Sequence, residues 1–144
     1  MVIGGKDFDP TDIFKALPWG SCYDNYEVIC SELIDIRAEW RVFVRYGNIV
    51  DVRGYKGDWK LHYDSAIIER CVASYYSQTA AFAMDMGMIS DGRTVLIEIN
   101  DGFSVGAYGL FHIDYAKFLA TRWAELTGID DEYDFLGEKM QWKR

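Results

Sequence analysis

The 144-residue sequence predicts an α+β fold, in which an antiparallel sheet carries flanking helices. Three observations support this prediction. Strand-length apolar runs occur in two pairs, and a short turn signal joins the members of each pair. Helical spacing of apolar residues follows each pair. Half of the residues are hydrophobic and 16% are aromatic, so a chain of this length can bury a substantial core.

The first part of the chain predicts one helix and three strands. Asp9 as N-cap and Pro10 at the first helical position begin a short helix over residues 9–17, which Pro18 closes. An apolar run of strand length follows over residues 26–34. Two further strands, over residues 39–46 and 49–56, are separated by the two-residue hairpin signal Gly47-Asn48.

The second part of the chain predicts helix, hairpin and helix. Asp64 caps a helix with helically spaced Ile67, Ile68, Cys71, Val72 and Tyr75. Strands over residues 81–89 and 94–100 flank Asp91-Gly92, a strong hairpin turn signal. A long final helix ends at Gly128. Its predicted inner face consists of Ile113, Ala116, Leu119, Ala120, Trp123 and Leu126.

Composition predicts a single cytoplasmic domain over residues 1–144, because no repeat or linker divides the chain. Residues 128–144 form a tail whose aromatic residues predict docking on the domain or on a partner. The net charge of −8 argues against indiscriminate binding to nucleic acid or anionic membranes. Three cysteines without metal or redox spacing indicate free thiols, and we identify neither a membrane-spanning run nor a signal peptide.

The second hairpin predicts a metal site. With Asp91-Gly92 at the centre of the turn, Asp85 faces Glu98 across the strands, and Asn100 shares their face. Carboxylates that lie directly opposite each other repel, so they need a proton or a cation between them. Magnesium would satisfy both carboxylates and the amide. The alternative is that both carboxylates are solvated and that the strand end merely starts a turn.

The first hairpin predicts a charged face. With Gly47-Asn48 at the turn, Glu39 lies opposite Lys56 and Arg41 lies opposite Gly54, all on one face. An acceptor for sugar hydroxyls then stands beside two cations for phosphate. The alternative is a solvated charge network. The other face is predicted to carry Trp40, Val42, Val44, Tyr46, Ile49 and Tyr55.

A serine hydrolase is a further alternative, because GFSVG over residues 102–106 fits the G-x-S-x-G nucleophile elbow with Ser104 as nucleophile. The rest of that pattern is missing. His112 follows only eight residues later, His62 precedes the serine, and the preceding elements are antiparallel hairpins.

Residues 26–127 resemble the C-terminal half of an ATP-grasp domain. The resemblance runs through EVICSEL, EWRVFVRYGNIVDVRGYKG, FAMDMG and VLIEINDGFSVGAYGLFHIDYAKFLATRW. It is most similar to the small ATP-grasp proteins of phage and bacteria, whose strand ends in Glu-x-Asn-Asp before a glycine loop with Tyr-Gly. The block VLIEINDGFSVGAYGL is the most specific part of the resemblance.

The resemblance implies ATP and Mg²⁺ as cofactors. Asp85, Glu98 and Asn100 match the residues that hold two magnesium ions on the ATP phosphates, and Glu39 matches the acid that binds the ribose. The adenine-binding hinge is matched by Cys30, Ser31, Glu32 and Leu33. The implied activity is an ATP-dependent carboxylate–amine ligase that acts through an acyl phosphate, on a carboxylate and an amine that the sequence does not identify.

Two departures from the family pattern bear on catalysis. Many ATP-grasp ligases have an arginine two residues before the metal-binding aspartate, where this chain has Ala83, so Arg41 or Lys56 is expected to supply the catalytic cation. Only 25 residues precede the matching region, and Lys6 and Lys15 do not replace a phosphate-binding lobe. We therefore expect a partner chain or a homodimer to supply the N-terminal lobe. The alternative is a non-catalytic nucleotide-binding, interaction or inhibitory module.

Overall fold

The computed structural model describes residues 2–3, 29–30 and 34–142, and it divides the chain into two compact units, residues 1–35 and 36–144. In the first unit, β1 (Val2–Ile3) pairs in parallel with β2 (Ile29–Cys30). The helix predicted over residues 9–17, Lys6 and Lys15 lie outside the described residues, as does most of the strand predicted over residues 26–34. The single-domain organisation remains a prediction.

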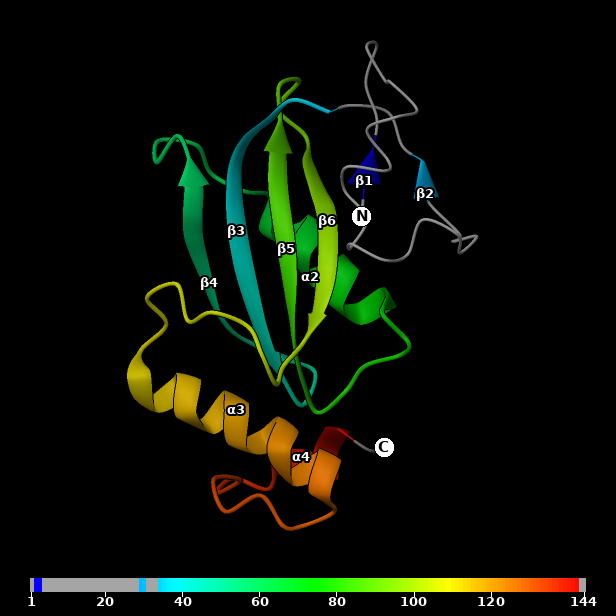
Figure 1. The fold of residues 1–144 in the computed structure, drawn as a ribbon, viewed down its shortest axis with the longest axis vertical. Coiled ribbons are helices and arrows are strands. Elements are labelled where there is room, and N and C mark those ends of the chain that lie inside the picture. Colours follow the sequence, from blue (N-terminus) through cyan, green and yellow to red (C-terminus); the bar gives the residue numbers. More distant parts are fainter. Residues whose placement is uncertain (1, 4–28, 31–33, 143–144) are drawn as a thin grey trace, which may run out of the picture. The chain divides into compact units, whose positions relative to one another are not determined.

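The second unit is a four-stranded antiparallel sheet in the order β4-β3-β5-β6 with helices, which confirms the predicted α+β class (Figure 1). None of the described helices is both long and apolar enough to traverse a bilayer. The elements are β3 (Ile36–Arg45), β4 (Asn48–Gly57), α2 (Ser65–Ser74), β5 (Ala81–Ile89), β6 (Thr94–Asp101), α3 (His112–Thr127) and α4 (Glu138–Trp142).

Helix α2 covers one face of the sheet. The Asp64 carboxylate accepts a hydrogen bond of 2.9 Å from the Ala66 backbone N–H, which confirms the predicted N-cap. Ile68 and Val72 of α2 are buried, as the helical spacing predicted. They pack in a core with Val42, Val44, Phe82, Met84 and Met86 from the two central strands.

Helix α3 packs on the other face, but through a side that differs from the predicted one. Its buried residues are Phe118, Thr121 and Ala124, and the Phe118 ring meets Phe43 edge to face at 5.4 Å. The predicted inner face is wrong because α3 turns polar side chains toward buried charges of the sheet. The outward side carries residues predicted to be internal, namely Ile113, Trp123 and Leu126. Gly128 ends α3 in the left-handed conformation at φ +71°, as predicted.

The β3–β4 turn lies one residue earlier than predicted. Arg45 pairs with Asn48, so Tyr46 and Gly47 are the central residues, both at positive φ. Two bulges then shift the register. As a result Glu39 pairs with Lys56 as predicted, whereas Arg41 pairs with Arg53 and not with Gly54.

The β5–β6 turn is one residue longer than predicted. The Ile89 backbone N–H donates to the Arg93 carbonyl, so Ser90 lies inside the turn and does not pair with Arg93. A register shift between Asp85 and Met86 on β5 adds one residue to β6, and beyond this bulge Asp85 pairs with Glu98. The predicted pairing is therefore confirmed, although the predicted turn is wrong.

The tail docks on its own unit. The Arg45 guanidinium binds the Asp131 carboxylate at 3.1 Å and the Tyr133 carbonyl at 3.1 Å. It also pairs with Glu138 of α4. The Trp142 ring lies 5.8 Å from the Tyr46 ring. Of the two predicted docking surfaces, the tail thus uses the domain.

Candidate functional site

Two acids and an amide gather on the α3-facing side of β5 and β6. Asp85 and Glu98 are directly paired across the strands, and the Asn100 amide donates 3.0 Å to Glu98 Oε1. Asp85 is 2% exposed, whereas the Glu98–Asn100 hydrogen bond is exposed. We call Asp85, Glu98 and Asn100 the acidic patch.

Arg41 of β3 neutralises the buried member of the acidic patch. Its Nε and Nη2 donate to the two carboxylate oxygens of Asp85 at 2.8 Å and 2.6 Å. The two residues are cross-strand partners, and Arg41 is 7% exposed. The hydrogen bonds to Asp85 raise the pKa of Arg41 against the opposing effect of burial, so the guanidinium keeps its charge.

Glu39 lies two residues before Arg41 on the same face of β3. Its carboxylate pairs with Lys56 and accepts 2.8 Å from the Tyr55 hydroxyl. Tyr55 was predicted on the opposite face, and this prediction is wrong because Tyr55 is the extra residue of a β-bulge. Burial, followed by the hydrogen bond to Glu39, raises the pKa of the Tyr55 hydroxyl.

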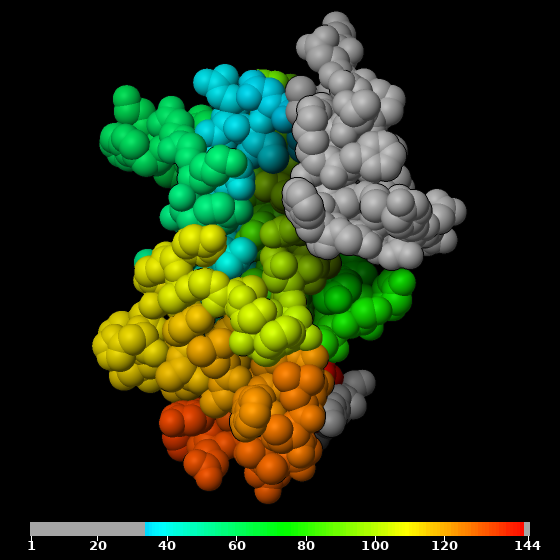
Figure 2. Space-filling view, in the orientation of Figure 1, coloured from blue at the N-terminus to red at the C-terminus, as the bar shows by residue number. Residues whose placement is uncertain are grey.

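Tyr108 covers Arg41 from the loop between β6 and α3. Its ring stacks on Tyr55 with centroids 4.5 Å apart and planes inclined by 15°. The Arg41 guanidinium carbon lies 4.6 Å from the Tyr108 centroid and 5.8 Å from the Tyr55 centroid. Figure 1 shows this loop, in yellow, crossing the sheet from β6 toward β4, and Figure 2 shows its atoms beside those of β3. We call the Tyr55–Tyr108 pair the aromatic cap.

Asp101 holds the end of β6 to α3. Arg122 Nε and Nη2 each donate 2.6 Å to the Asp101 carboxylate, and these hydrogen bonds lower the pKa of Asp101. Gly102 follows, and a Cβ there would lie 2.4 Å from the Ala81 carbonyl oxygen. The acid at the strand end is thus a structural residue, while Glu98 and Asn100 face the acidic patch.

The acidic patch offers oxygen ligands of the kind magnesium prefers. The Asn100 amide nitrogen is engaged with Glu98 Oε1, which leaves the Asn100 carbonyl oxygen and Glu98 Oε2 to accept other partners. Each Asp85 oxygen accepts one bond from Arg41 and keeps a second lone pair. Within the described residues, no group of three or more His, Cys, Asp or Glu side chains could hold a metal. A divalent ion would therefore need the amide and ligand oxygens to complete its coordination, as Mg²⁺ commonly does.

The geometry does not support a nucleophile elbow at Ser104. The serine is exposed, three residues beyond the end of β6, and α3 begins only at His112. In an elbow the serine sits on the strained turn between strand and helix. Among the described residues, no hydrogen bond joins Ser104 to His62 or His112, and the non-glycine residues at positive φ are Tyr46 and Tyr108.

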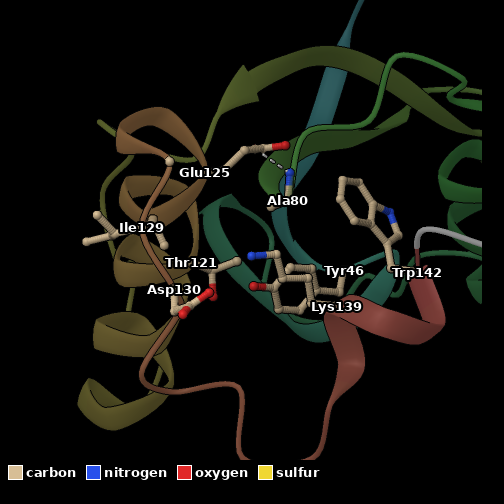
Figure 3. A pocket seen from close by; sticks show the side chains of 10 residues that line it. Tyr46, Ala80, Thr121, Glu125, Ile129, Asp130, Lys139 and Trp142 are labelled. Carbon is tan, nitrogen blue, oxygen red and sulfur yellow. Dashed lines mark hydrogen bonds between the residues drawn. The ribbon is translucent and has the colours of Figure 1, made fainter.

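The predicted adenine hinge belongs to the other compact unit. Cys30 is the last residue of β2, and Ser31, Glu32 and Leu33 lie outside the described residues. A separate cavity of about 250 Å³ lies between α3, the β3–β4 turn and α4, lined in part by Tyr46, Thr121, Lys139 and Trp142 (Figure 3). None of the predicted site residues lines this cavity.

The sequence prediction missed both rings of the aromatic cap. For Tyr55 no local signal exists, because the bulge that reverses its face depends on the neighbouring strand. For Tyr108 a signal was present: it stands in the run GAYG, and its φ of +44° is a conformation that flanking glycines make accessible. A tyrosine between glycines, after a strand with functional acids, indicates a residue held over the site.

The model of an ATP-grasp domain family, family 2 of its clade, matches residues 9–118. Among solved structures, N5-carboxyaminoimidazole synthetase from Staphylococcus aureus, complexed with ADP, is similar at 16% sequence identity and a TM-score of 0.49. That match covers 69% of this chain and 32% of the enzyme chain, so this chain spans less than two thirds of that protein. A comparison with curated proteins gives no match.

Proposed function

Because the chain belongs to this ATP-grasp domain family, we propose that it binds ATP with Mg²⁺ and acts as a carboxylate–amine ligase through an acyl phosphate. The observation that carries the proposal is the acidic patch. Asp85 and Glu98 are paired, Asn100 bonds to Glu98, and Arg41 binds Asp85 across the next strand. An acidic pair beside a guanidinium suits the phosphates of a metal-bound nucleotide.

The acidic patch would hold magnesium through Glu98, Asn100 and Asp85. When bound, the ion would neutralise the charge on the ATP phosphates. Lys56 is the more accessible cation, because its side chain is 68% exposed while it pairs with Glu39. Glu39 accepts from Tyr55 and Lys56, which leaves lone pairs for a ribose hydroxyl.

Arg41 and Lys56 would stabilise negative charge during phosphoryl transfer. In the first step a substrate carboxylate oxygen attacks the γ-phosphorus, and the bond to the β–γ bridging oxygen breaks to release ADP. In the second step the amine attacks the acyl carbon and phosphate leaves. Both steps gain most from fixed positive charge near the phosphate oxygens, which these two side chains would supply.

The described residues 34–142 supply one wall of such a site. We propose that an N-terminal lobe with phosphate-binding lysines is contributed by a partner chain or a second subunit. The proposal is supported by the resemblance of residues 26–127 to the C-terminal half of an ATP-grasp domain. It predicts that turnover requires the second polypeptide, and the solution mass of the purified chain tests whether a homodimer provides it.

Calorimetric titration with ATP, with and without Mg²⁺, tests the proposed function. Magnesium should strengthen ATP binding. Glu98→Gln and Asp85→Asn should each weaken the magnesium-dependent binding by at least about tenfold, which is about 1.4 kcal/mol. Asp114→Asn is the matched control, because it removes a carboxylate on α3 outside the acidic patch. Equal ATP affinity with and without magnesium, or unchanged binding in both patch variants, would falsify the metal assignment.

A non-catalytic nucleotide-binding or inhibitory module is the second candidate function. One observation favours it: Asp85 is saturated by Arg41 and lies beneath the aromatic cap, a closed arrangement that needs no turnover to persist. ADP release in the presence of mixed carboxylates and amines separates the two candidates. Binding without ADP release, also with the partner chain added, would identify the module.

A further inference from the structure

We infer that Tyr108 is a positioning residue that holds Arg41 on Asp85, and that its ring must leave before a phosphate-bearing ligand reaches this ion pair. The inference rests on the proposed function, and it adds a residue that the acidic patch does not contain. The juxtaposition that carries it is the Tyr108 ring, 4.6 Å from the guanidinium carbon of Arg41 and stacked on Tyr55.

Burial places the Tyr108 ring between solvent and the ion pair. Tyr108 is 47% exposed, whereas Arg41 is 7% exposed and Asp85 only 2%. The guanidinium edge is occupied by Asp85 and its face by the two tyrosine rings. A phosphate or a hydrated cation therefore cannot approach the pair directly from the side on which Tyr108 lies.

The backbone of the loop suits a displaceable ring. Tyr108 has φ +44°, a conformation that a bulky residue keeps only when surrounding contacts hold it. Its ring contacts with Tyr55 and Arg41 are the contacts that hold it here. Gly109 follows at φ +84°, and a Cβ there would meet nothing within 4 Å, so space exists beside the loop. Losing the ring contacts would let the backbone relax.

The charges explain why the closed state discriminates against binding. Arg41 and Asp85 neutralise each other, so the closed pair offers neither a free cation to phosphate nor a free carboxylate to a metal. Glu98, with which Asp85 pairs across the strands, adds negative charge that repels phosphate in the absence of a cation. Displacing Tyr108 frees the guanidinium face and admits water to the pair, which lowers the cost of separating the two charges.

Chemical modification of Arg41 tests the covering role without any nucleotide. Phenylglyoxal, an arginine-selective reagent, should modify Arg41 faster in Tyr108→Ala by roughly two- to thirtyfold, the factor that corresponds to a cation–π contact. Tyr108→Phe keeps the ring and should react like the wild type. Arg45 is the internal control, because it is 8% exposed on the same strand and bonded to other partners. Peptide mapping by mass spectrometry measures both sites in one sample.

Stopped-flow binding of Mg·ATP then tests the positioning role. The association rate constant should rise in Tyr108→Ala and stay at the wild-type value in Tyr108→Phe. Unchanged Arg41 reactivity in Tyr108→Ala overturns the inference, whether or not ATP binds. Faster modification with an unchanged association rate also overturns it, because the ring would then be only a structural cover. Absence of magnesium-dependent ATP binding in the wild type instead refutes the proposed function, while the modification rates still decide whether Tyr108 covers Arg41.

Discussion

Arg41 and Arg45 lie four residues apart on the same face of β3, and each is bound to an aspartate. They are 7% and 8% exposed. Their surroundings differ. Arg45 donates to Thr121, Asp131, the Tyr133 carbonyl and Glu138, so α3 and the tail enclose it. Within the described part of the chain, the Arg41 side chain hydrogen-bonds only to Asp85, and tyrosine rings cover its face.

The difference separates a structural arginine from a candidate functional one. Every side of the Arg45 guanidinium meets a protein group, so it joins strand, helix and tail and has no capacity left for a ligand. Arg41 lies under a loop residue that is half exposed, beside the solvent-facing Glu98 and Asn100. Burial alone does not distinguish the two. The number of partners and the nature of the cover do.

The largest expected effect concerns stability at the two aspartates. Asp131→Asn should lower the free energy of unfolding by about 3–5 kcal/mol, because it leaves Arg45 buried without its central carboxylate. Asp85→Asn should cost only about 1–2 kcal/mol, because water reaches Arg41 once the Tyr108 loop opens and repulsion from Glu98 is relieved. Urea denaturation of both variants measures the difference.

Double variants sharpen this comparison. Arg45→Met together with Asp131→Leu removes both charges and should recover part of the stability lost in Asp131→Asn. If Asp85→Asn proves as destabilising as Asp131→Asn, Arg41 is as firmly enclosed as Arg45, and the distinction between the two arginines is lost.

Acid sensitivity should be greater in the wild type than in a variant that lacks the Asp131 carboxylate. Burial alone raises the pKa of Asp131, but hydrogen bonds from Thr121, Tyr133, Tyr46 and Arg45 together lower it below its ordinary value. A lowered folded-state pKa gives stability that is present above the unfolded pKa of about 4 and is lost as pH falls through the folded value. The loss of stability from pH 5 to 2 should therefore be less steep in Asp131→Asn, by at most about 1.4 kcal/mol per pH unit. Identical slopes would exclude this contribution.

The acidic patch was predictable because errors in the predicted turns cancelled further along the strands. The β5–β6 turn has one more residue than Asp91-Gly92 suggested, and a bulge on β6 restores the pairing of Asp85 with Glu98. In the β3–β4 hairpin, two bulges compensate for the earlier turn by the time Glu39 meets Lys56. Between these points the predicted register is wrong, as the pairing of Arg41 shows.

Local sequence could not reveal features that long-range contacts impose. Tyr46 occupies a positive-φ turn position that a bulky residue rarely adopts, and its hydroxyl is held by Asp131, 85 residues away. On α3, apolar periodicity pointed to Trp123 as internal, but Thr121 and Arg122 turn inward to bind buried charges, which leaves Trp123 62% exposed. Helical periodicity records apolar residues, and here the sheet demands polar ones.

The smallest expected effect comes from the tyrosine hydroxyl beside each arginine. Tyr46 donates 2.9 Å to Asp131, and Tyr55 donates 2.8 Å to Glu39. Tyr46→Phe should lower the free energy of unfolding by about 1 kcal/mol and Tyr55→Phe by about 0.5 kcal/mol, because Glu39 keeps Lys56 and is nearer to solvent. Urea denaturation at neutral pH measures both values, and Asn48→Ala, in the same hairpin, controls for general loosening.

The same two variants should differ from the wild type most at alkaline pH. Burial, followed by a hydrogen bond to a carboxylate, raises the pKa of Tyr46 and of Tyr55. Stability from a raised pKa is fully present below the unfolded value of about 10 and is lost as pH rises through the folded value. Each Tyr→Phe variant should therefore lose less stability than the wild type as pH rises from about 9 to about 11. A steeper alkaline loss in Tyr55→Phe than in the wild type would show that the Tyr55 hydroxyl ionises freely, and that the aromatic cap over Arg41 stands open in solution.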